Sequence, residues 1–207
     1  MKVYNLKSVL VLIGVLFFNV SVYAQTAKEY LYSGDTCYRQ GNYNQAISDY
    51  SKAIEIKPDY VAYINRAYTY SRQGNFTKAI SDYTKAIEID PNFVNAYSDR
   101  GAAYIKQNNF TQAIIDLNKS IEINPNEAEV YKNRGFAYEN QNNFPQAIAD
   151  YTMAIEINPN YAEAYNNRGV AYVKQGGLPQ AISDFTKAIK INLNFRDAYK
   201  NRWFAYA

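Results

Sequence analysis

The side chains that recur along this chain suit ion pairing and hydrogen bonding, and few of them suit catalysis. There is no histidine and a single cysteine, Cys37. The sequence therefore cannot supply a Ser-His-Asp relay, a histidine-containing or multi-thiolate metal site, or an internal disulfide. Cys37 falls on an apolar helical face, where we expect a buried, inert thiol. Glycine-rich phosphate-binding motifs are also absent from the sequence. These residue types argue against an enzyme, and we expect no metal and no cofactor.

Two charged residue types recur at fixed places and could form ion pairs. Aspartate recurs in five successive segments, at Asp49, Asp82, Asp116, Asp150 and Asp184. Arginine recurs at Arg66, Arg100, Arg134, Arg168 and Arg202, with Ser33 at this place in the opening segment. Pairing each Asp with the Arg of the following segment leaves no charge over. We therefore predict the inter-repeat ion pairs Asp49–Arg66, Asp82–Arg100, Asp116–Arg134, Asp150–Arg168 and Asp184–Arg202. Unrelated, exposed charges are the alternative, worth about 0–1 kcal/mol per pair.

These aspartates belong to a phrase that repeats about every 34 residues. ISDYSKAIEIKP and its variants begin at Ile47, Ile80, Ile114, Ile148 and Ile182. A fixed period of this length predicts a solenoid, in which each unit buries its apolar face only against its neighbours. Solenoids present surfaces for binding, which directs the search for function toward partners.

One unit, residues 128–160, shows the elements that position these side chains. Tyr131 and Gly135 lie one turn apart on one face of a first helix. Asn143 can cap a second helix, and Pro159 disfavours helix in the residue before it and so ends that helix. Each unit is thus predicted to be a helix-turn-helix, with a small residue where the two helices approach closely. Leu193 replaces the closing proline in the last full unit, which could let that helix run on.

The pattern resembles the tetratricopeptide repeat family, whose units carry an aromatic, a Gly and a Tyr on the first helix and Ala, an aromatic, Ala and Pro on the second. The matching residues of one unit are Tyr131, Gly135, Tyr138, Ala147, Tyr151, Ala154 and Pro159. The resemblance implies an all-α, right-handed α-solenoid. Its five full repeats would be residues 27–59, 60–93, 94–127, 128–161 and 162–195, followed by a half repeat, 196–207.

The resemblance also implies a non-catalytic scaffold that holds a protein or an extended peptide in a concave groove lined by the first helices. The residue before each Arg should face this groove: Asn65, Asp99, Asn133, Asn167 and Asn201. Asparagine offers a donor and an acceptor, so a row of them can pair with both polar groups of a peptide bond. Tyr68 and Phe136 would favour an apolar side chain in the partner. The alternative is that Asn is simply tolerated on a wet helix face.

Other functions remain open at this point. The array could instead be an architectural or self-assembling component of an envelope complex, or a non-catalytic partner subunit of a separate enzyme. The half repeat carries Trp203 where earlier units carry Gly or Ala. Its helix could fold back onto Ile189 and Phe185, or it could join two molecules as a homodimer. A truncated C-terminus is the remaining alternative.

Residues 1–24 do not follow the repeat. Lys2 and Lys7 precede an apolar run, and Ala24 stands before Gln25, as in a cleavable secretory signal. We therefore expect residues 25–207 to form a periplasmic or secreted repeat array, with an uncleaved N-terminal membrane anchor as the alternative. Without the two lysines, 20 basic residues face 19 acidic ones, a net charge of +1. Such a balance lacks the positive field that nucleic-acid binding requires, and no small-molecule substrate is expected.

Overall fold

The structure, a computed structural model, describes residues 26–207, and all regular secondary structure in this range is helical. The predicted signal peptide, residues 1–24, lies outside the described residues. Among residues 26–207, no helix combines the length and the hydropathy needed to cross a membrane. The described residues divide into two compact units, of which the first ends at Pro91 and the second is Asn92–Ala207.

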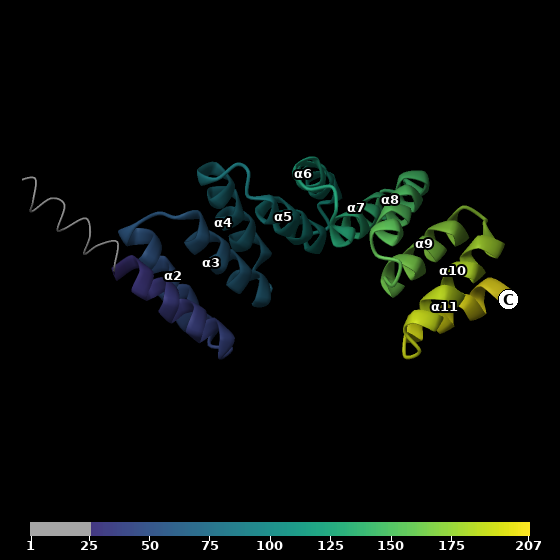
Figure 1. The fold of residues 1–207 in the computed structure, drawn as a ribbon, viewed down its shortest axis with the longest axis horizontal. Helices are drawn as coiled ribbons and strands as arrows, with labels where there is room; N and C mark the ends of the chain where they lie inside the picture. The colour runs from purple at the N-terminus through teal and green to yellow at the C-terminus, as the bar shows by residue number, and fades with distance from the viewer. Residues whose placement is uncertain (1–25) are drawn as a thin grey trace, which may run out of the picture. The chain divides into compact units, whose positions relative to one another are not determined.

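The first unit contains helical residues 26–39 followed by α2 (Tyr43–Ile56), α3 (Tyr60–Arg72) and α4 (Phe76–Ile89). The second contains α5 (Val94–Lys106), α6 (Phe110–Ile123), α7 (Ala128–Asn140), α8 (Phe144–Ile157), α9 (Ala162–Lys174), α10 (Leu178–Ile191) and α11 (Arg196–Tyr206). Helices pack in sequential pairs, α3 with α4, α5 with α6, α7 with α8 and α9 with α10, and within a unit each pair packs on the next (Figure 1). This arrangement confirms the predicted all-α solenoid of helix-turn-helix repeats.

The turn inside every repeat uses one left-handed residue. These residues have φ between 58° and 81° and are Gly41, Gly74, Asn108, Asn142 and Gly176. Gly and Asn tolerate this conformation better than other residues, so the chain can reverse within two or three positions. The next residue is the N-cap of the second helix. Asn42, Asn75 and Asn109 each accept a hydrogen bond from the backbone N–H three residues later, whereas Asn143 holds the same position without making that bond.

The second helices end in the same way whether or not a proline follows. Asn158, before Pro159, has φ −129° and ψ 92°, and its N–H donates to the carbonyl of Ala154. Asn192, before Leu193, has φ −128° and ψ 98°, and its N–H donates to the carbonyl of Ala188. The expectation that Leu193 could let α10 run on is therefore wrong. The extended conformation of the C-cap residue ends these helices, and the proline only adds to that preference.

Each repeat is closed by a large side chain set against a small residue. A Cβ on Gly135 would lie 2.8 Å from Cε1 of Tyr151, and a Cβ on Gly169 would lie 2.6 Å from Cε1 of Phe185. The rings of Tyr151 and Phe185 are completely buried. The glycines thus let paired helices approach closely enough for a ring to fill the space between them. By contrast, Cys37 on the first helix is half-buried, so the expectation of a buried thiol is wrong.

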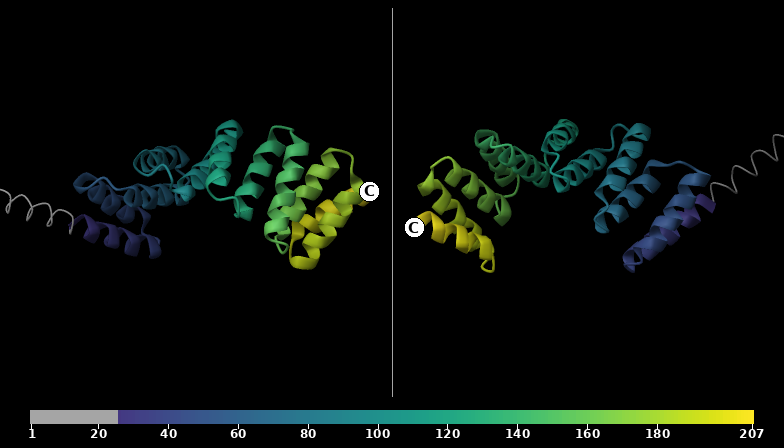
Figure 2. Two further views of the ribbon diagram at one scale, coloured as in Figure 1. Left: turned by 45° about the horizontal axis from the view of Figure 1, so that its top comes forward. Right: turned by 180° about the vertical axis from the view of Figure 1, so that it is seen from behind.

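Helix α11 packs on the preceding repeat through two alanines. Ala198 packs with Ala188 and Ile189, and Ala205 packs with Phe185. Figure 2 shows α11, in yellow, beside the green α9 and α10. The helix therefore does fold back onto Ile189 and Phe185. Trp203 takes no part in this packing and keeps 65% of its surface exposed.

Candidate functional site

The recurring arginines bind the aspartate of their own repeat. The ion pairs are Arg66–Asp82 (2.7 Å), Arg100–Asp116 (2.7 Å), Arg134–Asp150 (2.6 Å) and Arg168–Asp184 (2.8 Å). In each pair, Nε donates to one carboxylate oxygen and Nη2 donates to the other. The predicted inter-repeat pairs Asp49–Arg66, Asp82–Arg100, Asp116–Arg134, Asp150–Arg168 and Asp184–Arg202 are therefore wrong.

The close approach of paired helices explains this correction. Each of the four paired Arg residues immediately precedes the small residue of its first helix, and its Asp partner immediately precedes the ring or Leu that packs on that small residue. Because Gly135 meets Tyr151, the residues before them, Arg134 and Asp150, also face each other across the same crossing. The guanidinium carbon of Arg134 additionally lies 5.5 Å from the ring centroid of Tyr131. The carboxylate is thus fixed within one repeat.

The third guanidinium nitrogen supplies the contact between repeats. Nη1 of Arg134 donates to Oδ1 of Asn118 at 2.6 Å, and Nη1 of Arg168 donates to Oγ1 of Thr152 at 3.0 Å. Arg66 reaches Ser51 in the same way at 2.8 Å. These partners stand two residues after the Asp of the preceding repeat. Sequence reasoning missed them, although a hydroxyl or an amide recurs at that place in every repeat.

The two ends of the array explain the unmatched charges. Asp49 accepts hydrogen bonds from the Ser33 hydroxyl at 2.7 Å and from the Gln45 amide at 2.9 Å. Arg202 donates to the Thr186 hydroxyl at 3.3 Å, and its guanidinium carbon lies 5.8 Å from the Tyr199 ring centroid. The two charges that have no ionic partner are thus each held by uncharged side chains of the array.

A cavity of about 320 Å³ opens in the first unit, and its lining includes two predicted groove residues. It is lined by Asp35, Tyr38, Arg39, Tyr50, Asn65 and Tyr68. Helical residues 26–39 and α3 supply five of these side chains, and α2 supplies Tyr50. Asn65 donates to Oδ1 of Asp35 at 2.9 Å, so its amide already has one polar partner.

A larger cavity, of about 380 Å³, opens in the second unit and brings three predicted groove residues together. Its lining comprises Ala102, Ile105, Lys106, Lys132, Asn133, Phe136, Glu163, Asn166, Asn167, Phe195 and Asp197. Most of them come from the first helices α5, α7 and α9. Asn133, Phe136 and Asn167 therefore share one cavity. Within residues 26–207 the Asn133 side chain makes no hydrogen bond, which leaves its donor and acceptor available.

The other two predicted groove residues lie elsewhere. Asn201 lines a separate cavity of about 130 Å³ with Phe204, and its amide donates to Oδ1 of Asn166 at 3.0 Å. Asp99 is half-buried on α5 and is not among the residues lining these three cavities. The predicted row is thus divided among different surroundings. Asn166, one residue before the predicted position Asn167, is buried. Sequence analysis missed it because no recurring residue type marks its place in the repeat.

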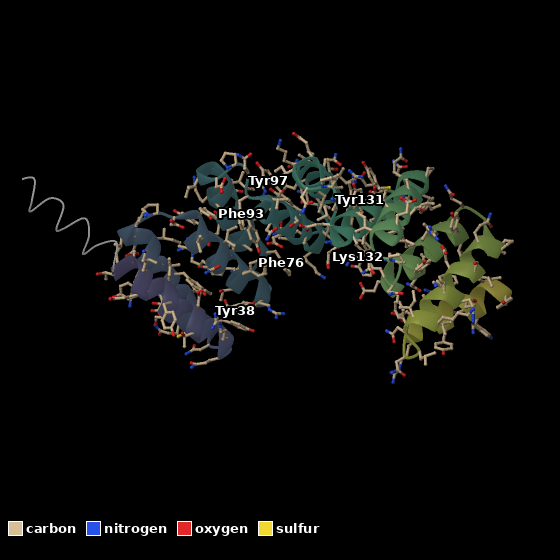
Figure 3. The ribbon with its side chains drawn as sticks, in the orientation of Figure 1. Tyr38, Phe76, Phe93, Tyr97, Tyr131 and Lys132 are labelled. Atoms are coloured by element: carbon tan, nitrogen blue, oxygen red, sulfur yellow. The ribbon has the colours of Figure 1, made fainter. Side chains whose placement is uncertain are left out.

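Lys132, which is labelled in Figure 3, lines the larger cavity and brings it a largely buried positive charge. Its side chain is 16% exposed, and Nζ lies 3.2 Å from Glu129 and 3.6 Å from Glu163. Nζ also lies 5.7 Å from the ring centroid of Tyr161. Burial works against the charge, but Tyr161 and Glu129 outweigh it and hold the pKa of Lys132 above its ordinary value. Lys132 therefore stays charged beside Asn133.

Nothing in residues 26–207 groups three or more Cys, Asp or Glu side chains as a metal site would. The cavities instead combine amides, aromatic rings and charged side chains on helices that are fixed by packing. Such surfaces can bind a partner by hydrogen bonding and apolar contact.

Comparisons with known proteins agree with this architecture. A family model described as "TPR repeat" matches residues 34–74, 101–142 and 140–176. Two models described as "Tetratricopeptide repeat" match residues 60–93 and 162–195, and residues 82–115. No curated protein sequence matches the chain significantly.

Solved structures share the fold over most of the chain. A crystal structure of MamA protein is 27% identical, with a TM-score of 0.77 over 82% of this chain and 93% of that one. YrrB, described as a TPR protein with an unusual peptide-binding site, is 21% identical, with a TM-score of 0.74 over 84% and 90%. A tetratricopeptide repeat protein from Parabacteroides merdae ATCC 43184 is 20% identical, with a TM-score of 0.79 over 88% and 73%. The last two show the fold alone.

Proposed function

Because the chain belongs to the tetratricopeptide repeat family, we propose that it is an exported, non-catalytic scaffold that holds an extended peptide or protein segment against its first helices. The observation that carries this proposal is the cavity of about 380 Å³ that joins Asn133 and Asn167 with Phe136. Two amides beside an aromatic ring suit a peptide backbone flanked by an apolar side chain. The peptide-binding site named for YrrB adds an example on the same fold.

Each chemical group of this cavity has a distinct task in the proposal. The unpaired amide of Asn133 pairs with the N–H and C=O of the partner's backbone, and Asn167 extends that pairing to the next repeat. The side chain of Phe136 is 40% exposed and gives an apolar residue a surface to pack on. Lys132, held by Glu129 and Glu163, keeps the wall between these groups in place.

Replacing Asn133 and Asn167 together by alanine is expected to weaken peptide binding about 30-fold, because each lost hydrogen bond is worth about 1 kcal/mol. Backbone recognition predicts an equal loss for all peptide sequences. Binders selected from a random peptide library, measured by fluorescence polarisation, test this. In contrast, Phe136→Ala should penalise only peptides with an apolar residue at the contact.

The double variant Asn126→Ala/Asn160→Ala is the matched control, because both residues are exposed in turns between repeats. It should bind as the unmodified protein does. Unchanged affinity of the Asn133/Asn167 variant would contradict the proposed site.

The export part of the proposal rests on residues 1–24. Intact-mass measurement of protein recovered from the periplasm or the medium should show a chain that begins at Gln25. Full-length chains found only in the membrane fraction would contradict cleavage and favour an N-terminal anchor.

Self-association through α11 is a second candidate, favoured by one observation. Tyr199, Trp203, Phe204 and Tyr206 are all exposed on this helix. The rings of Trp203 and Phe204 pack edge to face with centroids 5.0 Å apart, so they present one continuous aromatic surface. Aromatic residues are enriched at protein interfaces, and a homodimer through this surface would remove it from water.

A further inference from the structure

The cavity of the first unit differs chemically from the one in the second. Its lining includes Asp35, which directly follows Gly34 on the first helix. The same place in the other repeats holds only uncharged residues, Tyr68, Ala102, Phe136, Val170 and Phe204. A carboxylate at this position of the first helix is therefore a property of the first repeat alone.

Two neighbours hold Asp35 in a fixed orientation. Oδ1 accepts a hydrogen bond from the Tyr50 hydroxyl at 2.7 Å and another from the Asn65 amide at 2.9 Å. Tyr50 is buried, and burial together with Asp35 raises the pKa of its phenol, so it keeps the proton that it donates. No side chain among residues 26–207 donates to Oδ2. Oδ1 is thus anchored, whereas Oδ2 accepts no hydrogen bond from the described part of the chain.

Tyrosine rings form the walls around this carboxylate. Tyr38 and Tyr68 both line the cavity, and the side chain of Tyr68 is 44% exposed (Figure 3 labels Tyr38). The Tyr68 ring packs edge to face on Tyr83, with centroids 6.3 Å apart, so its orientation is set by the buried core. Aromatic faces attract cations, most strongly when the cation is partly desolvated.

Two arginines limit what can enter. Arg39 lines the cavity from an exposed position, and Arg72, also exposed, donates to the Tyr38 hydroxyl at 3.3 Å. Neither binds Asp35. They repel a run of basic residues, and they can donate to the carbonyls or acidic groups beside a single cation. The charge pattern therefore suits one isolated positive group.

We propose that this cavity receives a single lysine or arginine side chain of a bound peptide. Its charged end pairs with Asp35, and its aliphatic stem lies between Tyr38 and Tyr68. Asn65 donates to Asp35 through Nδ2, and its side-chain oxygen Oδ1 can accept a hydrogen bond from a backbone N–H of the same peptide. The volume of about 320 Å³ falls within the roughly 300–1,000 Å³ of ligand pockets. This inference rests on the proposed peptide-binding function and assigns it a sequence preference.

The test uses acetylated, amidated glycine pentapeptides with a central Lys, Arg or norleucine, titrated into residues 25–207 and followed by NMR. Lys and Arg peptides are expected to shift the side-chain amide signals of Asn65 and to bind about tenfold more tightly than the norleucine peptide. Asp35→Asn keeps an acceptor for Tyr50 and Asn65, and it should remove that preference. Glu55→Gln, the same charge change at an exposed site on α2, should leave the preference for Lys and Arg peptides unchanged.

Tyr68→Leu should reduce the preference several-fold while keeping the apolar volume. Equal binding of the Lys and norleucine peptides, or a preference that survives Asp35→Asn, would overturn the inference. The Asn133→Ala/Asn167→Ala variant separates the two proposals, because it alters the cavity of the other unit. If it leaves library binding unchanged while the lysine preference persists, the proposed site fails and this cavity stands. The reverse outcome removes only the cation pocket.

Discussion

Replacement of Asp150 by alanine is expected to lower the free energy of unfolding by about 2–4 kcal/mol, because it leaves the Arg134 guanidinium largely buried without its carboxylate. The side chains of Arg134 and Asp150 are 19% and 6% exposed, and Nη2 of Arg134 lies 2.6 Å from Oδ1 of Asp150. Urea unfolding followed by circular dichroism measures the loss. Lys119→Ala, which removes an exposed pair with Glu122, is the control and should scarcely change stability.

The double variant Arg134→Met/Asp150→Leu is expected to recover most of that loss. Burial disfavours the Arg134 charge, but Asp150 outweighs it and holds the pKa of Arg134 above its ordinary value. Burial raises the pKa of Asp150, although Arg134 opposes the rise. Both partners therefore pay for desolvation, and the intact pair contributes less than either single deletion costs.

Double-mutant cycles distinguish the pairing within a repeat from pairing between repeats. A large coupling energy is expected between Arg134 and Asp150, and almost none between Arg134 and Asp116, which binds Arg100. A coupling to Asp116 as strong as that to Asp150 would contradict the structure. A modest coupling to Asn118 is expected from its 2.6 Å hydrogen bond.

Replacement of Trp203 by alanine is expected to weaken self-association at least about 30-fold, because interface tryptophans often contribute 2 kcal/mol or more. Trp203 contributes nothing to the packing of α11, which is made by Ala198 and Ala205, so melting of the monomer should not change. Sedimentation equilibrium over a range of concentrations measures the effect.

Tyr32→Ala provides the matched control for Trp203→Ala. Tyr32 is 76% exposed on the first helix of the array, so its removal takes away an exposed aromatic side chain outside α11. A protein that remains monomeric at all concentrations, or a dimerisation constant that survives Trp203→Ala, would argue against α11 as an interface.

The spacing of small and aromatic residues was enough to predict the repeat and its helices. Gly135 and Tyr151 are placed by local rules, since helical periodicity puts each on one face and only Gly or Ala fits opposite a ring. The turn residues Asn142 and Gly176 likewise follow from the conformations that Asn and Gly tolerate. A fixed period then repeats these local preferences along the chain.

Which side chains meet across helices was decided by the tertiary structure. Arg134 lies 16 residues before Asp150 and 18 residues after Asp116. Because the two separations are similar, sequence spacing could not choose its partner. The crossing at Gly135 chose it, by placing Arg134 opposite Asp150. The same holds for Asp35, whose orientation is set by hydrogen bonds from Tyr50 and Asn65 on two other helices. Periodicity fixes the face on which a side chain lies, whereas its partner depends on how the helices pack.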